Sequence, residues 1–402
     1  MGRDLQLLII LSVFLLYLYL KINGIIKQLL PEKYKLPLRL TVWGGMGVLV
    51  GIYIIRAYNP FGLRHMMPDA FYYPLWFALV YMVQTVPYLL LIDLLILPLY
   101  SIYKKNKPSY RSIRAKVLMA IMGFFLLYVP LRMWYDDSNV RVLEMSYEKE
   151  QLARDLEDLK IVLIADIQLD AYTTEEEVLN YLNKVNDLEP DLVLLAGDYI
   201  TGTPNYIDPI GKLLPTLKAK YGVIGCAGDH DHWAYRGGDW GKNQARSIRE
   251  VKESLESGGI PLLIDENRDI RIGESVIKLT STNQTYAADI SNEVLDSLTL
   301  DTTDYDLKIF LNHQPKTRLV KKASATGYDF FLAGHTHGGQ VKFLFPFFSF
   351  TTAGLGQDSG YIKGEYRYED MLIAVCSGLG MSIAPIRYNC TPDIVLIRLK
   401  AS

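Results

Sequence analysis

Five apolar runs of strand length in the second part of the chain end in residues of the types that bind metal ions. A single Asp after a strand usually caps a turn or the next helix. The repetition outweighs that interpretation, because ligands in α/β folds gather beyond the carboxyl ends of the strands. We therefore expect these side chains to converge on one site. The runs are Ile161–Ala165 before Asp166, Leu192–Ala196 before Gly197-Asp198, Val223–Ala227 before Gly228-Asp229-His230-Asp231, Ile309–Leu311 before Asn312-His313, and Tyr328–Ala333 before Gly334-His335-Thr336-His337.

The histidines are concentrated at the same strand endings. Of the six in the chain, all but His65 lie in or beside these endings, namely His230, His232, His313, His335 and His337. A single histidine would more often be a structural residue, so the distribution itself is informative. His335 and His337 stand one residue apart among glycines, a spacing that is typical of a metal-binding turn.

Three carboxylates and three imidazoles can hold two divalent cations about 3.5–4 Å apart, bridged by one carboxylate and one water. The residual positive charge would bind a phosphoryl oxygen and lower the pKa of the bridging water, so that hydroxide forms near neutral pH and attacks phosphorus in line. His230 would donate a proton to the leaving oxygen or stabilise the developing charge. The residues concerned are Asp166, Asp198, Asp229, His313, His335 and His337.

The order and spacing of these motifs resemble those of the calcineurin-like metallophosphoesterases, whose pattern is D-x-H, G-D, G-N-H-[DE], a later H and G-H-x-H. The resemblance covers about Lys160 to Leu399 and is strongest to the membrane-associated branch, in which a phosphohydrolase domain follows transmembrane segments. It implies an α/β/β/α fold, a β-sandwich flanked by helices. The spacing of strands and helices along the chain likewise favours stacked sheets with flanking helices over a simple doubly wound sheet.

By this resemblance, Asp198 is shared by two metals, and His230 is the catalytic histidine. One metal would also take Asp166, Gln168 and His337, and the other Asp229, His313 and His335. Two positions depart from the family pattern, because Gln168 replaces a histidine and Asp229 replaces an asparagine. Both changes favour harder ions, so we expect Mn²⁺ or Mg²⁺, with Zn²⁺ or iron as alternatives.

Two further features allow two interpretations each. The guanidinium of Arg387 is either a phosphate clamp in the substrate-binding site or part of a surface ion pair. The aromatic run Phe343–Phe350 either contacts the bilayer or an acyl chain, or belongs to the core of the sandwich. Its proline and its proximity to the metal turn favour the lipid interpretation.

The first third of the chain has the composition of a membrane domain. Residues 1 to about 135 are apolar with few acids, which raises the hydrophobic fraction of the whole chain to 50%. We expect a transmembrane domain over 1–135, a connector over 136–159 and a metallophosphoesterase domain over 160–402. About four transmembrane helices are predicted, at Leu5–Leu20, Leu40–Ile55, Phe71–Tyr100 and Val117–Trp134.

The third of these segments is long and contains three prolines and Asp93, which favours a kinked helix or a helix with an interfacial extension. Asp93 faces the interior of the helical bundle or marks a functional polar contact, and we favour a structural role. Lysines and arginines gather between the first two segments and between the last two. The positive-inside rule places those loops in the cytoplasm and the catalytic domain outside it, in a multi-pass protein of the cell membrane.

Two functions remain open from the sequence. The first is a membrane enzyme that hydrolyses a phosphoester or pyrophosphate bond, with the lipid bilayer and a phosphorylated amphiphilic or small-molecule substrate as partners. The second is a non-catalytic membrane sensor or scaffold whose divergent site binds metal or phosphate, which the departures at Gln168 and Asp229 keep open. The net charge of -2 gives no indication of nucleic-acid binding.

Overall fold

The chain folds into two compact units. One comprises Met1–Trp134 with Lys342–Phe350, and the other comprises Tyr135–Val341 with Thr351–Ser402. The computed structural model describes residues 2–58, 69–102, 107–235, 240–300, 303–351, 360–382 and 384–401, so that His65 lies outside the described residues. The segment Lys342–Phe350, which the sequence places within the phosphoesterase domain, groups with the helical unit.

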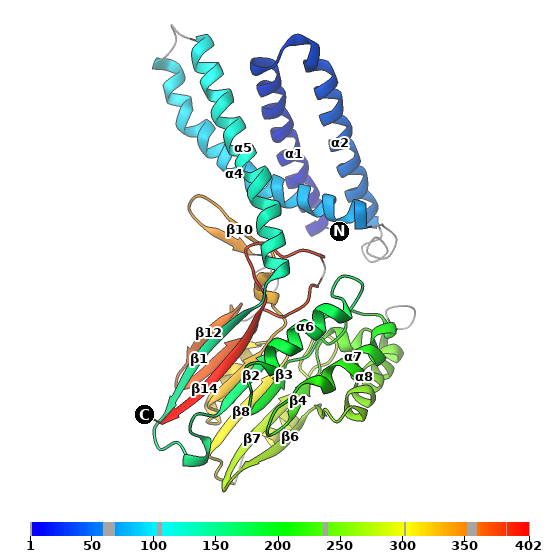
Figure 1. Cartoon of the computed structure of the whole chain (residues 1–402), viewed down its shortest axis with the longest axis vertical. Coiled ribbons are helices and arrows are strands. Elements are labelled where there is room, and N and C mark those ends of the chain that lie inside the picture. The colour runs from blue at the N-terminus through cyan, green and yellow to red at the C-terminus, as the bar shows by residue number, and fades with distance from the viewer. Residues whose placement is uncertain are drawn as a thin grey trace. The chain divides into compact units, whose positions relative to one another are not determined.

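The helical unit contains four long helices within its described residues (Figure 1): α1 (Gly2–Leu29), α2 (Glu32–Tyr58), α4 (Asp69–Ile102) and α5 (Lys107–Ser138). Each of the four predicted membrane segments lies in one of them. Three stretches of the described residues are long and apolar enough to cross a membrane, at Ile9–Leu29, Tyr73–Ile96 and Ser109–Ser138. None of the three lies in α2, so the fourth span stays a prediction.

Asp93 links three of these helices. Its carboxylate accepts hydrogen bonds from the hydroxyl of Tyr17, at 2.8 Å, and from the guanidinium of Arg114, at 2.5 Å, and it forms an ion pair with Lys21. α1, α4 and α5 are thereby joined by one acidic group, which fits the structural role that we favoured. The three prolines inside α4 break its hydrogen-bond ladder, and the helix changes direction along its length (Figure 1).

The second unit consists of two six-stranded sheets (Figure 1). The first has the order β1-β14-β2-β3-β4-β5, and its strands are β1 (Arg141–Lys149), β2 (Lys160–Ile164), β3 (Leu192–Leu195), β4 (Val223–Cys226), β5 (Leu262–Leu263) and β14 (Asp393–Ala401). The second has the order β12-β13-β9-β8-β7-β6, and its strands are β6 (Glu266–Ile272), β7 (Ser275–Thr282), β8 (Leu307–Asn312), β9 (Phe330–Ala333), β12 (Gly364–Tyr368) and β13 (Met371–Val375). Residues 136–159, expected to be a connector, contribute β1.

Alternation along the strands divides the apolar side chains among three cores. Leu163 and Leu194 of the first sheet pack with Ile309 and Leu332 of the second, whereas Val162 faces the helices on the outer side. Outside the first sheet lie α6 (Glu175–Asn186), α7 (Ile207–Leu213) and α8 (Trp240–Ser257), and outside the second lie α9 (Asn292–Thr299) and α10 (Thr317–Ala325). The predicted α/β/β/α order of layers is therefore confirmed.

Local signals explain where two of the outer helices begin and end. α6 begins with the predicted capping arrangement, because the Thr174 hydroxyl accepts from Glu177 N and the Glu177 carboxylate accepts from Thr174 N. The sequence pattern predicts a further helix from about 208 to 219, but α7 ends at Leu213. Pro215 has no amide hydrogen with which to continue the helix, and Leu214–Thr216 form a 3₁₀ turn instead.

We predict that replacing Leu194 with alanine destabilises the phosphoesterase unit by about 2–5 kcal/mol, because Leu194 is fully buried between the two sheets. Leu179→Ala on the outer face of α6 is the matched control, since that side chain is 37% exposed and should cost little. Chemical unfolding of the purified proteins in detergent measures both. Equal losses of stability in the two variants would contradict the assigned core.

Candidate active site

The candidate ligands meet because β2, β3 and β4 run parallel and end at the same edge of the first sheet. Asp166, Asp198 and Asp229 follow these three strands. In the second sheet, His313 and His335 follow the parallel neighbours β8 and β9. Packing of the two sheets brings both sets of strand endings together, as the sequence pattern predicts.

Two groups of side chains at this edge could each hold a cation. The ligand atoms of Asp166, Asp198 and His313 lie within 4.8 Å of one another, and so do those of Asp229, His313 and His335. His313 is common to both groups, with Nε2 3.3 Å from Asp198 Oδ2 and 3.5 Å from Asp229 Oδ2. Asp198, the shared ligand by the family resemblance, lies in the first of these groups, and its sharing by two ions stays a prediction.

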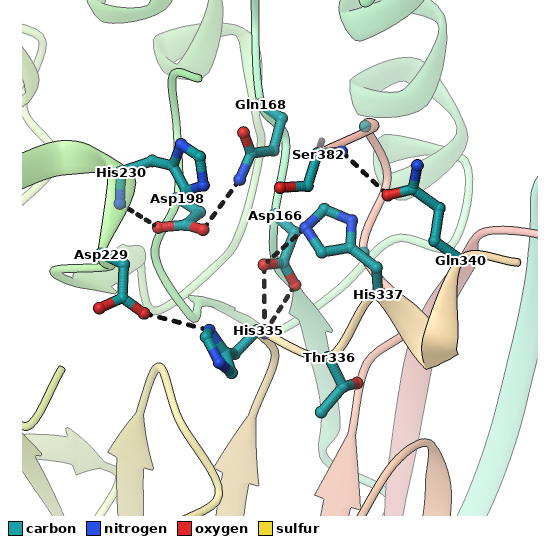
Figure 2. Close-up of polar contacts among 12 residues, drawn as sticks. Asp166, Gln168, Asp198, Asp229, His230, His335, Thr336, His337, Gln340 and Ser382 are labelled. Atoms are coloured by element: carbon teal, nitrogen blue, oxygen red, sulfur yellow. Dashed lines mark hydrogen bonds and ion pairs between the residues drawn. The ribbon is translucent and has the colours of Figure 1, made fainter. Parts of the chain in front are cut away.

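The two remaining candidate ligands lie beside the first group. His337 Nε2 is 3.4 Å from Asp166 Oδ1, and Gln168 Nε2 donates to Asp198 Oδ2 at 2.8 Å. In Figure 2 the carboxylate of Asp166 lies beside the ring of His337, and that of Asp229 lies beside the ring of His335. All seven predicted metal ligands are thus brought together at one site.

Unpartnered atoms show that these residues fit divalent cations. Gln168 Oε1 and His337 Nδ1 are among the buried polar atoms of the described residues that have no hydrogen-bond partner, and Nε2 is the nitrogen of His337 that faces Asp166. A buried acceptor without a partner is costly unless another ligand satisfies it. An amide oxygen and an imidazole nitrogen beside two carboxylates are donors that Mn²⁺, Mg²⁺ and Zn²⁺ accept. The arrangement therefore suits a pair of metal ions.

Burial and mutual charge shift the pKa values of these groups in opposite directions. Burial raises the pKa of Asp166 to about 8, assisted by the charge of Asp198. Although burial opposes it, the nearby His313 imidazolium holds the pKa of Asp198 well below its usual range, and Asp198 in turn raises the pKa of His313 against the effect of burial. Burial, with the charge of Arg387, keeps the pKa of His337 far below its ordinary value, so this ring is a neutral ligand.

The backbone at the site is strained. Five of the seven candidate ligands have positive φ angles between 49° and 70°, namely Asp166, Gln168, Asp198, His335 and His337. Such left-handed conformations are unfavourable for residues other than glycine and concentrate at functional sites. Glycines permit the accompanying close approaches: a Cβ on Gly228 would lie 2.3 Å from Asp198 Oδ1, and one on Gly334 would lie 2.6 Å from Asp166 Oδ2.

Comparison with known proteins agrees with this geometry. Residues 159–339 match the family of calcineurin-like phosphoesterases. This part of the chain belongs to that family. The resemblance noted in the sequence motifs is thereby confirmed, and the protein is a phosphoric ester hydrolase by class.

Three relatives of this calcineurin-like phosphoesterase illustrate the similarity. The uncharacterised metallophosphoesterase YkuE of Bacillus subtilis is 27% identical over 277 residues, which are 65% of this chain and 86% of that protein. An uncharacterised metallophosphoesterase of Campylobacter jejuni is 26% identical over 70% of this chain and 68% of its own length. The phosphodiesterase YaeI of Escherichia coli is 24% identical over 60% of this chain and 82% of its own length.

Arg387 of this phosphoesterase has a different role from the two that we considered. Its side chain is only 1% exposed, so it is neither in a surface ion pair nor open to a substrate. The guanidinium donates to the carbonyl oxygens of Ser377 and Gly378 at 3.0 Å and of Gly380 at 2.6 Å. The expectation of a phosphate clamp is therefore wrong for this conformation: burial commits the guanidinium to the backbone of the loop that lies against Asp166.

Three residues that the sequence analysis did not assign to the site hold its ligands in place. Asp231 accepts backbone hydrogen bonds from Asp198 N and Tyr199 N at 2.9 Å and from Gly228 N at 2.8 Å. Gln314 Nε2 and Tyr286 N donate to the two oxygens of Asp229, each at 2.5 Å. Asp231 and Gln314 adjoin the recognised motifs in sequence, which was the available signal for them, whereas no motif marked Tyr286.

His230 lies at the same edge, partly buried. Its backbone amide donates to Asp198 Oδ1 at 2.8 Å, and its Nδ1 atom contacts the carbonyl oxygen of Thr201. This contact makes Nδ1 the protonated nitrogen in the neutral ring and leaves Nε2 on its opposite side. The ring also packs edge to face on Trp233, with 5.4 Å between the ring centroids.

We predict that the affinity of this site for Mn²⁺ falls as the pH is lowered from about 8 to about 6. Asp166 and His313 have raised pKa values and hold protons near neutrality, so a cation must displace those protons to bind. Each displaced proton weakens binding by up to about tenfold per pH unit. Titration calorimetry at several pH values measures how steeply the Mn²⁺ affinity depends on pH. In the Asp166→Asn variant this dependence should be weaker. A dissociation constant that does not change with pH would contradict this assignment.

Proposed function

We propose that the protein is a membrane-anchored, dinuclear metal-dependent phosphohydrolase. The observation that carries this proposal is the gathering of Asp166, Asp198, Asp229, His313 and His335 into two overlapping ligand groups at one edge of the sheets, with the unpartnered Gln168 Oε1 beside them. A structural ion-pair cluster would satisfy its polar atoms internally, whereas a metal site leaves ligand atoms to be satisfied by the ion.

Seven residues would hold the two ions. Compared with the family pattern, Gln168 replaces a nitrogen ligand by an oxygen ligand, and Asp229 adds a negative charge. This favours Mn²⁺ or Mg²⁺ over Zn²⁺ or iron. When bound, two such ions supply Lewis-acid activation of water and neutralise charge on the phosphoryl oxygens. The protein residues fix the geometry, because Gln314 and the backbone of Tyr286 donate to the carboxylate of Asp229, whereas Asp231 accepts from the backbone amide of Asp198.

His230 would act as the general acid. With Nδ1–H held by the Thr201 carbonyl, the ring would act as an acid in its imidazolium form, whose second proton, on Nε2, would pass to the oxygen of the leaving group and leave a neutral ring. Asp198 accepts from the His230 backbone and so keeps the residue beside the ligands. The reaction that these roles support is hydrolysis of a phosphoester or pyrophosphate bond, and the name of the Escherichia coli relative favours the phosphoester.

The substrate is proposed to be amphiphilic or lipid-linked. Three helices are long and apolar enough to hold the enzyme in a bilayer, which would raise the effective concentration of a membrane-bound substrate. The asymmetry of positively charged loop residues supports an extracytoplasmic catalytic unit in the cell membrane.

We predict that the purified protein hydrolyses a bis-aryl phosphodiester in the presence of Mn²⁺ and that Asp198→Ala lowers the rate by at least about 100-fold. Asp198 lies in one ligand group and orders Gln168 and His230, so its loss disrupts binding and geometry together. Asp208→Ala, an exposed position in α7, should leave the rate unchanged. Equal rates for the native protein and the Asp198→Ala variant would overturn the catalytic proposal.

The non-catalytic sensor makes the opposite prediction for Asp229. Both oxygens of Asp229 accept hydrogen bonds, from Tyr286 N and Gln314 Nε2. In asparagine one of these oxygens becomes an NH₂ group, which would face another hydrogen-bond donor. We therefore expect Asp229→Asn to lower metal affinity about tenfold and to reduce hydrolysis. Calorimetry and the phosphodiester assay test both effects. Activity that appears only in Asp229→Asn would identify the native protein as a binder instead of an enzyme.

A further inference from the structure

A short hairpin in the helical unit is the feature that the catalytic site leaves unexplained. It consists of β10 (Lys342–Leu344) and β11 (Ser349–Thr351), and we refer to residues 342–351 as the aromatic hairpin. Its turn is closed by Phe345 N, which donates to Phe348 O at 2.8 Å. No charged residue occurs in the sequence from Phe343 to Phe350. Figure 1 shows β10 beside the helices of its unit.

The hairpin exposes large apolar side chains at its tip. Phe347 is 85% exposed and Phe348 is 64% exposed, and Leu344 and Phe350 are partly uncovered as well. Adjacent exposed phenyl rings are unfavourable in water, by about 25 cal/mol for each Å² of apolar surface. A contiguous surface of this kind is typical of a protein or membrane contact.

The backbone of the hairpin is hydrogen-bonded to a helix that is apolar enough to cross a membrane. The side chain of Gln84 in α4 donates from Nε2 to Leu344 O at 2.5 Å and accepts from Leu344 N at 3.2 Å. The Tyr88 hydroxyl also donates to Leu344 O, at 2.9 Å. Both polar groups of the Leu344 backbone are therefore satisfied by α4, as a backbone group away from water requires.

These contacts also explain a polar residue inside an apolar helix. Gln84 lies near the middle of Tyr73–Ile96, one of the stretches long and apolar enough to span a bilayer, and its side chain is only 1% exposed. A carboxamide buried at such a position is retained where it hydrogen-bonds another segment. Its two hydrogen bonds to Leu344 supply that partner.

We propose that the aromatic hairpin is inserted into the bilayer and that Phe347 and Phe348 contact the acyl chains of membrane lipid. Acyl chains are the favoured occupant because the same unit exposes apolar side chains of its membrane-length helices, such as Leu94 in α4 and Leu127 in α5. The hairpin extends that apolar surface without adding a charge. This inference rests on the membrane anchoring in the proposed function but not on catalysis.

Spin labels on the full-length protein in lipid bilayers test the proposal. The three native cysteines are buried, so a cysteine introduced at an exposed position can be labelled selectively. Phe347→Cys reports on the hairpin, Leu127→Cys on the surface of α5, and Lys218→Cys on the exposed surface of the phosphoesterase unit. Relaxation by oxygen, which concentrates in lipid, is compared with relaxation by a water-soluble nickel complex.

We expect the ratio of oxygen to nickel accessibility at Phe347 to match that at Leu127 and to exceed that at Lys218 several-fold. An accessibility ratio at Phe347 equal to that at Lys218, measured while the ratio at Leu127 indicates lipid, would overturn the proposal that the hairpin is inserted. A protein partner at its tip would then be favoured. The proposed membrane-anchored enzyme would be unaffected. If the accessibility ratio at Leu127 also equals that at Lys218, the helical unit is not in the bilayer. Both the proposed membrane anchoring and the proposed insertion of the hairpin are then wrong.

Two further variants test the connection to α4. Gln84→Leu removes the acceptor of the Leu344 amide and one of the two donors to its carbonyl, whereas Tyr88→Phe removes only the other donor. The label at Phe347 should therefore become more mobile in Gln84→Leu, with a smaller change in Tyr88→Phe. Unchanged spectra in both variants would show that α4 does not hold the hairpin.

Discussion

Apolar packing between the two sheets is the interaction on which the site depends. Leu163 and Leu194 of the first sheet pack against Ile309 and Leu332 of the second, and this contact aligns the carboxyl ends of the central strands at one edge. Asp166 and the backbone amide of His335, which are 169 positions apart in sequence, then lie within hydrogen-bond distance. The polar chemistry is therefore positioned by side chains that take no part in it.

Two local features of the site are energetically unfavourable: the burial of charged side chains and the left-handed backbone conformations. Carboxylates and imidazoles are buried together, and each requires an opposite charge or a donor to remain there. Several ligands also adopt left-handed backbone conformations, which cost on the order of 1 kcal/mol each. The hydrogen bond that the backbone amide of Asp198 donates to Asp231, and glycines that allow close approach to Asp166 and Asp198, hold these conformations. A rigid, strained edge of this kind is expected where ligand geometry matters more than local stability.

The sequence predicted those parts of the structure that follow from strand endings. Asp198 and His335 could be placed at one site because parallel strands share an edge and each residue directly follows an apolar run. Arg387 could not be placed, because a guanidinium that binds carbonyl oxygens has the same sequence signature as one that binds phosphate. The same limit applies to Tyr286, which contributes a backbone amide that no residue type encodes.

Long-range contacts were the other limit. The aromatic run could be described from composition, but its contact with Gln84 joins positions 260 residues apart and is visible only in the fold. α7 was predicted too long because the apolar pattern continues beyond Pro215, although the backbone cannot. Asp93 was assigned correctly to a structural contact, since an acid in an apolar helix requires partners, but those partners lie on two other helices.

The division of the chain into two units has a consequence for how this protein can be taken apart. The polypeptide passes from one unit to the other after Trp134, after Val341 and again after Phe350. A fragment that begins at Tyr135 would carry Leu344 without Gln84 and would present two phenyl rings to solvent, so it should aggregate despite an intact catalytic fold. The phosphoesterase unit is therefore not separable from the helical unit by a single cut, and a chimera with different N-terminal helices would need a redesigned 342–350 segment as well.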